Sequence, residues 1–166
     1  LRATGSFAVV CRHNIPLTEY TMVMRTRGEG LFYAHCVIRK NMHRSGYAPL
    51  EDVFGAVPDV KDPRFEFLFT DMPCMLEPYL RNRDSDAYEY IKDRLGLGSL
   101  HKYAHKCRLF NDMMFKSFAG DTAGENGEHW FGLLKHHKDR LKSQGFNSYV
   151  TLLNTAQDFR LQCQNA

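Results

Sequence analysis

The sequence predicts an α/β or α+β domain, because strand-like segments come first, helices and strands then alternate, and helices end the chain. Apolar and β-branched residues dominate 7–11, and residues 17–24 show a period of two, as strands do. Apolar residues then recur at helical spacing over 31–43. The length of 166 residues, with 43% hydrophobic and 25% charged residues, fits one folded domain spanning residues 1–166.

Turn-forming residues separate these first segments from one another. Asn14 and Pro16 interrupt the first two strands, which we expect to pair as a hairpin. A polar stretch at 25–30 precedes the helix, and a loop rich in Gly, Pro and Asp follows it at 46–63. The apolar run 65–69 predicts a buried central strand with Asp71 at its C-terminal end.

The second half of the chain is predicted to be mainly helical. Helices are expected at 75–80 and 85–95, the second with Asp84 or Ser85 as its N-cap and with glycines after its end. An extended segment at 100–104 leads into apolar residues 110–118 and a Gly-rich, acidic stretch at 119–127. Two amphipathic helices, 128–142 and 148–162, complete the prediction.

Composition excludes several classes of protein. No apolar run approaches the ~20 residues of a membrane span, so no membrane partner is expected. Five cysteines without CxxC spacing argue for reduced thiols inside a cell rather than a disulfide scaffold. The net charge of +3 permits a polyanionic partner without requiring one. Neither a GxSxG motif, a P-loop nor a dinucleotide fingerprint is present.

Asp71 is the first candidate site residue. The C-terminal end of a central strand is where α/β domains gather catalytic groups, and Asp71 follows such a strand. It could equally be the N-cap of the following helix, with Pro73 in the first turn. From this feature alone the capping role is favoured.

Glu125 and Glu128 form the second candidate. They lie three residues apart where a helix begins, so both can face the same side. Mg²⁺ is commonly held by one or two carboxylates, with water and phosphate in the remaining positions. Acidic residues in a first helical turn also complement the helix dipole, and alone this second explanation is favoured.

His101, His105 and Cys107 form the third candidate. On a helix the two histidines would share a face, whereas in an extended segment His105 and Cys107 would point to one side. Imidazole and thiolate are ligands for Zn²⁺, with Cys74 or Cys11 available as a further ligand. Exposed histidines beside a buried cysteine are the competing interpretation.

Taken in order, these motifs resemble the transposases of the Kyakuja–Dileera–Zisupton group. Each fragment is unspecific, but their order across most of the chain is hard to obtain by chance. The matching pieces are Cys11-Arg12-His13, Gly28-Glu29, Asp71-Met72-Pro73-Cys74, His101-x3-His105-x-Cys107 and Gly124-Glu125-x-x-Glu128-x-Trp130.

The resemblance implies an RNase H-like catalytic core of the DDE/DDD type, in which two Asp and one Glu hold two Mg²⁺ or Mn²⁺ ions. Asp71 matches the second acid, and Glu128 matches the last acid, with Glu125 as its rival. The His/Cys residues match an insertion at about 84–120 that is a candidate zinc site. The implied partners are DNA, at transposon ends and target, and a second copy of the chain, and the implied location is the nucleus.

The family's first catalytic Asp belongs to a strand upstream of the Cys-Arg-His motif, and the sequence given begins after it. We therefore expect a fragment that is inactive alone and whose complete form cuts and joins DNA by two-metal phosphoryl transfer. This hypothesis predicts that Asp71 and Glu128 lie side by side. The alternative is a non-enzymatic, zinc-stabilised module that binds DNA or protein.

Overall fold

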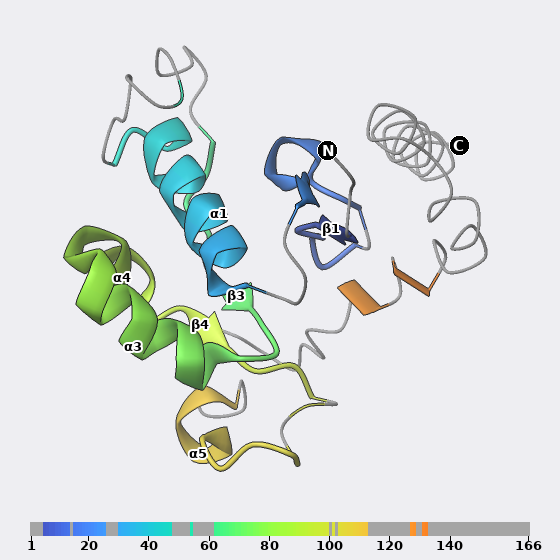
Figure 1. Ribbon diagram of the computed structural model, residues 1–166, viewed down its shortest axis with the longest axis vertical. Helices are drawn as coiled ribbons and strands as arrows, with labels where there is room; N and C mark the ends of the chain where they lie inside the picture. The colour runs from blue at the N-terminus through green and yellow to red at the C-terminus, as the bar shows by residue number, and fades with distance from the viewer. Residues whose placement is uncertain are drawn as a thin grey trace. The chain divides into compact units, whose positions relative to one another are not determined.

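The computed structural model describes residues 5–13, 15–25, 30–47, 54, 62–99, 101, 103–112, 127–128 and 131–132. The chain divides into two compact units, one made of Leu1–Glu29 with Glu125–Ala166 and the other of Gly30–Gly124. Their described elements form a mixed α/β structure, as the sequence predicts (Figure 1). One domain over 1–166, with an insertion at about 84–120, stays a prediction.

The described N-terminal part of the first unit is a hairpin. Strands β1 (Gly5–Phe7) and β2 (Met22–Met24) pair antiparallel, which confirms the predicted hairpin. The bounds differ: β1 overlaps the strand predicted at 7–11 only at Phe7, beyond which Val10 forms an isolated bridge to Pro16, and β2 is shorter than 17–24. A short 3-10 helix, η1 (Thr18–Tyr20), replaces the first part of the second strand, and the Tyr20 N–H donates to the Leu17 carbonyl at 2.9 Å.

The second unit begins with helix α1 (Leu31–Arg44), close to the predicted range 31–43. Two nested hydrogen bonds end the helix. Gly46 N–H donates to the His43 carbonyl, and Tyr47 N–H donates to the Met42 carbonyl, both at 2.9 Å. Gly46 has a φ of 71°, a left-handed conformation that glycine adopts without steric strain. The sequence therefore stops the helix at a defined residue.

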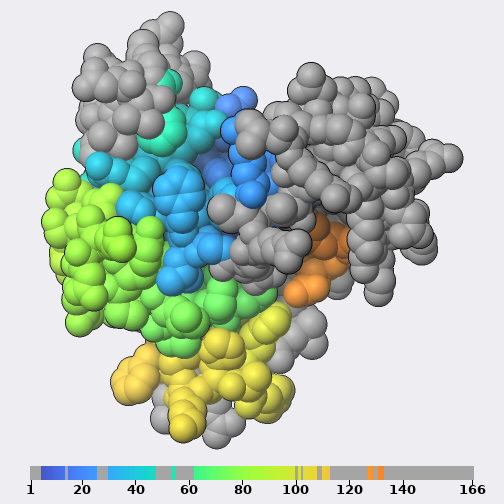
Figure 2. Space-filling model, in the orientation of Figure 1, coloured from blue at the N-terminus to red at the C-terminus, as the bar shows by residue number. Residues whose placement is uncertain are grey.

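Strands β3 (Leu68–Phe69) and β4 (Leu95–Gly96) pair in parallel and are joined through α3 (Pro73–Arg83) and α4 (Ser85–Ile91). Helix α1 packs against both α3 and α4, and these two helices pack against each other (Figure 1). Figure 2 shows the surfaces of α1, α3 and α4 lying against one another. Apolar residues from all three helices and β4 are buried: Val37, Ile38, Met42, Leu76, Leu80, Ala87, Tyr90, Ile91, Leu95 and Leu97.

The predicted end of α4 and the predicted extended segment after it are wrong. The helix predicted at 85–95 ends at Ile91, because Leu95 is buried in β4 beside β3 and cannot continue the helix. The residues described within 100–104 form turns rather than a strand, with Ala104 N–H donating to the His101 carbonyl at 3.0 Å. Asp112, after helix α5 (Arg108–Asn111), adds a parallel bridge to Leu97.

Several predicted segments fall largely outside the described residues. These are the apolar residues 110–118, the acidic stretch 119–127 and the helices 128–142 and 148–162. Residues 127–128 and 131–132, which are described, are helical.

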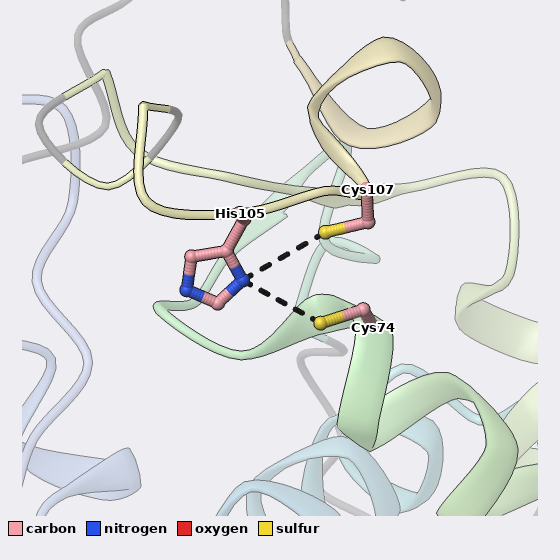
Figure 3. Close-up of side chains that lie close together, drawn as sticks. All are labelled: Cys74, His105 and Cys107. Atoms are coloured by element: carbon pink, nitrogen blue, oxygen red, sulfur yellow. Dashed lines mark hydrogen bonds between the residues drawn. The ribbon is translucent and has the colours of Figure 1, made fainter.

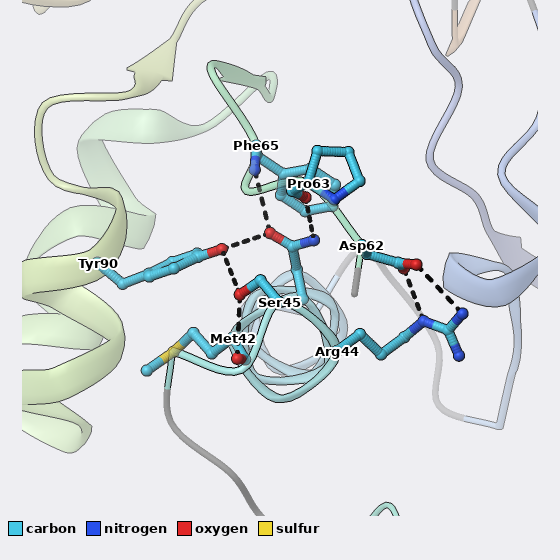
Figure 4. Close-up of polar contacts among 8 residues, drawn as sticks. Met42, Arg44, Ser45, Asp62, Pro63, Phe65 and Tyr90 are labelled. Atoms are coloured by element: carbon cyan, nitrogen blue, oxygen red, sulfur yellow. Dashed lines mark hydrogen bonds and ion pairs between the residues drawn. The ribbon is translucent and has the colours of Figure 1, made fainter. Parts of the chain in front are cut away.

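A buried amide on α1 holds the segment that leads into β3. The Asn41 side chain is 1% exposed, and its Nδ2 donates to the Pro63 carbonyl at 3.1 Å. Its Oδ1 accepts from the Phe65 N–H at 3.1 Å and from the Tyr90 hydroxyl at 2.6 Å (Figure 4). One side chain thus joins α1, α4 and the chain preceding β3, and the helical periodicity of α1 did not reveal it.

Asp84 joins three helices at the α3–α4 junction. It caps α4 by accepting from the Ala87 N–H at 3.1 Å, which confirms one of the two predicted N-caps. Its other oxygen lies 2.7 Å from His35 Nε2 and 3.1 Å from Arg39 Nε, both on α1. Burial raises the pKa of Asp84, but the hydrogen bonds and the positive charge of Arg39 outweigh it, so the pKa is lowered overall.

Asp84→Asn is therefore expected to remove pH-dependent stability. The pKa of Asp84 is lower in the folded protein than in the unfolded chain. Its contribution to the unfolding free energy is therefore complete at pH values above the ordinary aspartate pKa and is lost as the pH falls through the folded pKa. Asparagine still caps the helix, so the variant should lose about 1.5–3 kcal/mol of unfolding free energy at pH 7 through the charged contacts alone. Urea unfolding from pH 7 to pH 2.5 should show the wild type and variant converging. Asp86→Asn, in an exposed position of the same turn, is the control; equal pH profiles for wild type and D84N would contradict the prediction.

Candidate functional site

Two candidate site residues lie just after β3: Asp71 in the connection to α3, and Cys74 in the first turn of α3. β3 is only Leu68–Phe69 and is half-buried, so it is shorter and less buried than the strand predicted at 65–69; Asp71 follows it after Thr70. The N-cap of α3 is Met72, with no side-chain hydrogen bond, and Pro73 begins the helix. Thr70 Oγ1 accepts from the Met72 N–H at 3.4 Å and turns the chain here. The interpretation of Asp71 as a helix cap is therefore wrong, and its carboxylate is available for another role.

Asp71 faces His101, which lies in the turns that follow β4. His101 Nε2 lies 3.3 Å from Asp71 Oδ1. The two side chains are 32% and 44% exposed, so an ion from solvent can reach this pair. The sequence left open whether this segment is helical or extended; its described residues form turns, and His101 lies beside Asp71.

Cys74, His105 and Cys107 form a second cluster, at the first turn of α3 (Figure 3). The Nδ1 atom of His105 lies 3.5 Å from Cys74 Sγ and 3.8 Å from Cys107 Sγ. Tetrahedral coordination with Zn–S and Zn–N bonds of ordinary length places nitrogen and sulfur about 3.6 Å apart. Both nitrogen–sulfur distances are thus close to what one zinc ion requires, and all three ligand atoms lie within 4.8 Å of one another. His105 and Cys107 are both half-buried, so an exposed histidine beside a buried cysteine does not describe them.

The electrostatics of this cluster also favour a cation. Partial burial raises the pKa of the Cys74 thiol, and the neighbouring Cys107 raises it further by its hydrogen bond and charge. The backbone N–H groups of Cys74 and Met75, at the helix start, act in the opposite direction but do not outweigh these effects. Two adjacent thiolates thus disfavour each other, and a bound divalent ion would reverse that balance.

The sequence left two candidates for the additional cysteine ligand, and in the structure Cys74 lies beside His105 and Cys107. Cys11 belongs to the other unit, where its Sγ lies 3.9 Å from His13 Nδ1. The residues around Cys74 gave no local signal that its partners, His105 and Cys107, lie more than thirty residues away. Only the parallel pairing of β3 with β4 brings the two segments together.

Of the two candidate glutamates, Glu128 is exposed and lies in a helical residue pair of the first unit. Glu125 lies outside the described residues. Asp71 belongs to the second unit, so the predicted pairing of Asp71 with Glu128 stays a prediction.

Comparison with known families assigns the chain to one of them. A family model described as Kyakuja-Dileera-Zisupton transposase matches residues 1–159. The chain belongs to this family. No match was found among the curated proteins or among the solved structures. None of the described helices is long and apolar enough to span a membrane.

In this Kyakuja-Dileera-Zisupton chain the donor atoms divide by chemistry. Asp71 and His101 offer oxygen and nitrogen, whereas Cys74, His105 and Cys107 offer sulfur and nitrogen. The second set fits Zn²⁺, because thiolate and imidazole are its usual structural ligands. The Asp71 carboxylate fits a harder ion such as Mg²⁺ or Mn²⁺.

Proposed function

We propose that the chain is part of the RNase H-like catalytic core of a DNA transposase whose complete form cuts and joins DNA by metal-assisted phosphoryl transfer. The family match supports the transposase assignment. The observation that carries the site is the position of Asp71, which follows a strand of a parallel pair, does not cap α3 and remains partly exposed. Carboxylates at this edge of a sheet commonly serve catalysis.

The order of the described elements supports the same core. An antiparallel pair, β1 and β2, is followed by α1, and then by the parallel strands β3 and β4 with α3 and α4 between them. In this proposal Asp71 is the second acid of the catalytic set. Glu128 is the last acid, with Glu125 as its rival.

The proposed acids would hold Mg²⁺ or Mn²⁺, and such ions, when bound, stabilise the attacking and leaving oxygens of a phosphodiester. Asp71 contributes a fixed carboxylate because its backbone follows directly from β3, where Thr70 N–H donates to the Gly96 carbonyl at 3.0 Å. DNA is the proposed partner, in agreement with the net charge of +3. Action on chromosomal DNA would place the protein in the nucleus, as a monomer or with a second copy of itself.

Asp71→Asn is expected to abolish specific Mn²⁺ binding by the chain. The substitution removes the anionic oxygen but keeps the size of the side chain, so affinity should fall by more than the roughly tenfold typical of losing an outer-shell partner. Titration followed by the EPR signal of free Mn²⁺ measures it. Glu77→Gln, on the exposed face of α3, is the matched control; equal Mn²⁺ affinity in wild type and D71N would overturn the proposed site.

The same titration decides between the two glutamates. Glu128→Gln or Glu125→Gln, whichever removes the last acid, should weaken Mn²⁺ binding, and the other should leave it unchanged. In the complete transposase, D71N should also abolish metal-dependent cleavage at transposon ends.

A second candidate function is favoured by the Cys74, His105 and Cys107 cluster. Its spacing suits zinc, so the chain could act as a zinc-stabilised module that binds DNA or protein without cutting. This function predicts zinc in the purified protein. It also predicts that the D71N variant binds Mn²⁺, and the DNA or protein partner, as the wild type does. The two functions are compatible, since a catalytic core can contain a structural zinc.

A further inference from the structure

His101 and Asp71 are thirty residues apart in the sequence, yet the backbone holds them together from two sides. On one side, the register of β4 with β3 fixes where the turns after Gly96 begin. The His101 N–H then donates to the Gly98 carbonyl at 3.1 Å. The position of His101 beside the strand end is therefore a consequence of the sheet register.

On the other side, His105 and Cys107 contact Cys74 in the first turn of α3. Asp71 precedes α3 and Cys74 lies in its first turn, so the turn segment meets the start of α3 twice, at His101 and again at the thiol cluster. A segment held at both ends cannot move the His101 backbone far from Asp71 without breaking strand pairing or the cluster. His101 is thus held beside the carboxylate.

The distance between the two side chains is that of neighbouring metal ligands. Octahedral coordination at about 2.1 Å places adjacent ligand atoms about 3 Å apart. The 3.3 Å between His101 Nε2 and Asp71 Oδ1 differs from this by a few tenths of an ångström, which small side-chain rotations can supply. Both atoms can therefore enter one coordination sphere in adjacent positions.

We propose that His101 is a direct ligand of the divalent ion at Asp71 and shifts that site toward Mn²⁺ over Mg²⁺. The proposal rests on the proposed function, since it assumes an ion at Asp71. Mg²⁺ takes oxygen ligands in near-ideal octahedral geometry, whereas transition-metal ions also accept imidazole nitrogen. A mixed oxygen and nitrogen set therefore lowers the relative affinity for Mg²⁺. If His101 instead only orients Asp71 through a hydrogen bond, no metal–nitrogen bond exists.

The test is pulsed EPR on the full 166-residue chain, saturated with zinc and then loaded with Mn²⁺. A bound imidazole nitrogen modulates the electron spin echo of Mn²⁺. We expect this modulation in the wild type and in the control His13→Asn, and its loss in His101→Asn. Competition titrations should show Mn²⁺ affinity falling by more than about tenfold in H101N, because a direct ligand rather than an outer-shell partner is lost, while Mg²⁺ affinity changes less than twofold.

The outcomes separate this proposal from the proposed function. Mn²⁺ binding that depends on Asp71 but shows no nitrogen modulation overturns the role of His101 and leaves the proposed function standing. Mn²⁺ binding that is unaffected by D71N overturns both. Nitrogen modulation that persists in H101N also overturns the proposal, because the nitrogen then belongs to another histidine.

Discussion

Cys74→Ser is expected to release zinc from the purified protein and to lower its melting temperature. Cys74 supplies one of three ligand atoms among the described residues, with His105 Nδ1 and Cys107 Sγ as the others. Structural zinc sites contribute about 10–16 kcal/mol in total, so one ligand of four is worth about 3 kcal/mol, or about a hundredfold in affinity. The cluster fixes residues 105–107 to α3, and this contact is expected to weaken with the metal.

The measurement is zinc content by mass spectrometry, together with thermal unfolding before and after chelation. A ligand present at a hundred times its dissociation constant stabilises by about 2.7 kcal/mol, which corresponds to about 10 °C or more for a unit of this size. Cys36→Ser, a half-buried cysteine on α1 outside the cluster, should keep both zinc and melting temperature. Wild-type protein without zinc, or a chelator-insensitive melting curve, would rule out the site.

Asn41→Ala is expected to produce the largest loss of stability. The substitution removes the donor to the Pro63 carbonyl and the acceptor for both the Phe65 N–H and the Tyr90 hydroxyl. Each buried polar group that loses such a contact costs about 1–3 kcal/mol. Because the groups can adjust together, we expect a total of about 3–5 kcal/mol in unfolding free energy, comparable to breaking a buried network.

Guanidinium unfolding of the full chain, followed by circular dichroism, measures this loss. Tyr90→Phe removes a single hydroxyl from the same network and keeps the ring, so it should lose about 1–1.5 kcal/mol. If Asn41→Ala is only partly folded, the loss measured for Tyr90→Phe still tests the network. A loss below 1 kcal/mol for Asn41→Ala would show that Pro63 and Phe65 are held by other contacts.

The local signals in the sequence predicted the elements better than their pairing. The run of apolar residues before Thr70 indicated a strand ending at Asp71, and the spacing of Ile38 and Met42 indicated α1, because both features depend on neighbours in the chain. The local pattern of 85–95 is helical and includes Leu95, so it predicts a longer helix than α4. Its burial beside β3 depends on residues almost thirty positions away.

The same reason explains the candidate sites. The motif containing His101, His105 and Cys107 predicted metal-ligating residues, but its spacing left open whether His105 pairs with His101 or with Cys107. In the turns of the structure His101 reaches Asp71, and His105 reaches Cys74. The residue types predicted metal binding. Which ligands belong to which cluster depends on the parallel pairing of β3 with β4, which the local sequence does not reveal. Asn41 was missed because a single amide on an apolar helix face gives no pattern.

The contact between Arg44 and Asp62 has a consequence for how the chain can vary in length. The Arg44 guanidinium lies 2.6 Å from the Asp62 carboxylate, and the Asp62 N–H donates to the Arg44 carbonyl at 3.1 Å. The two ends of the intervening segment are thus joined by the folded unit itself. Because the entropy of closing a loop grows only slowly with its length, insertions or deletions that spare the helix end at Gly46 and Tyr47 and the contact of Phe54 with His43 need not disturb Arg44 or Asp62. We expect length differences among family members to concentrate there, and a peptide tag placed there to leave both metal-ligand clusters intact.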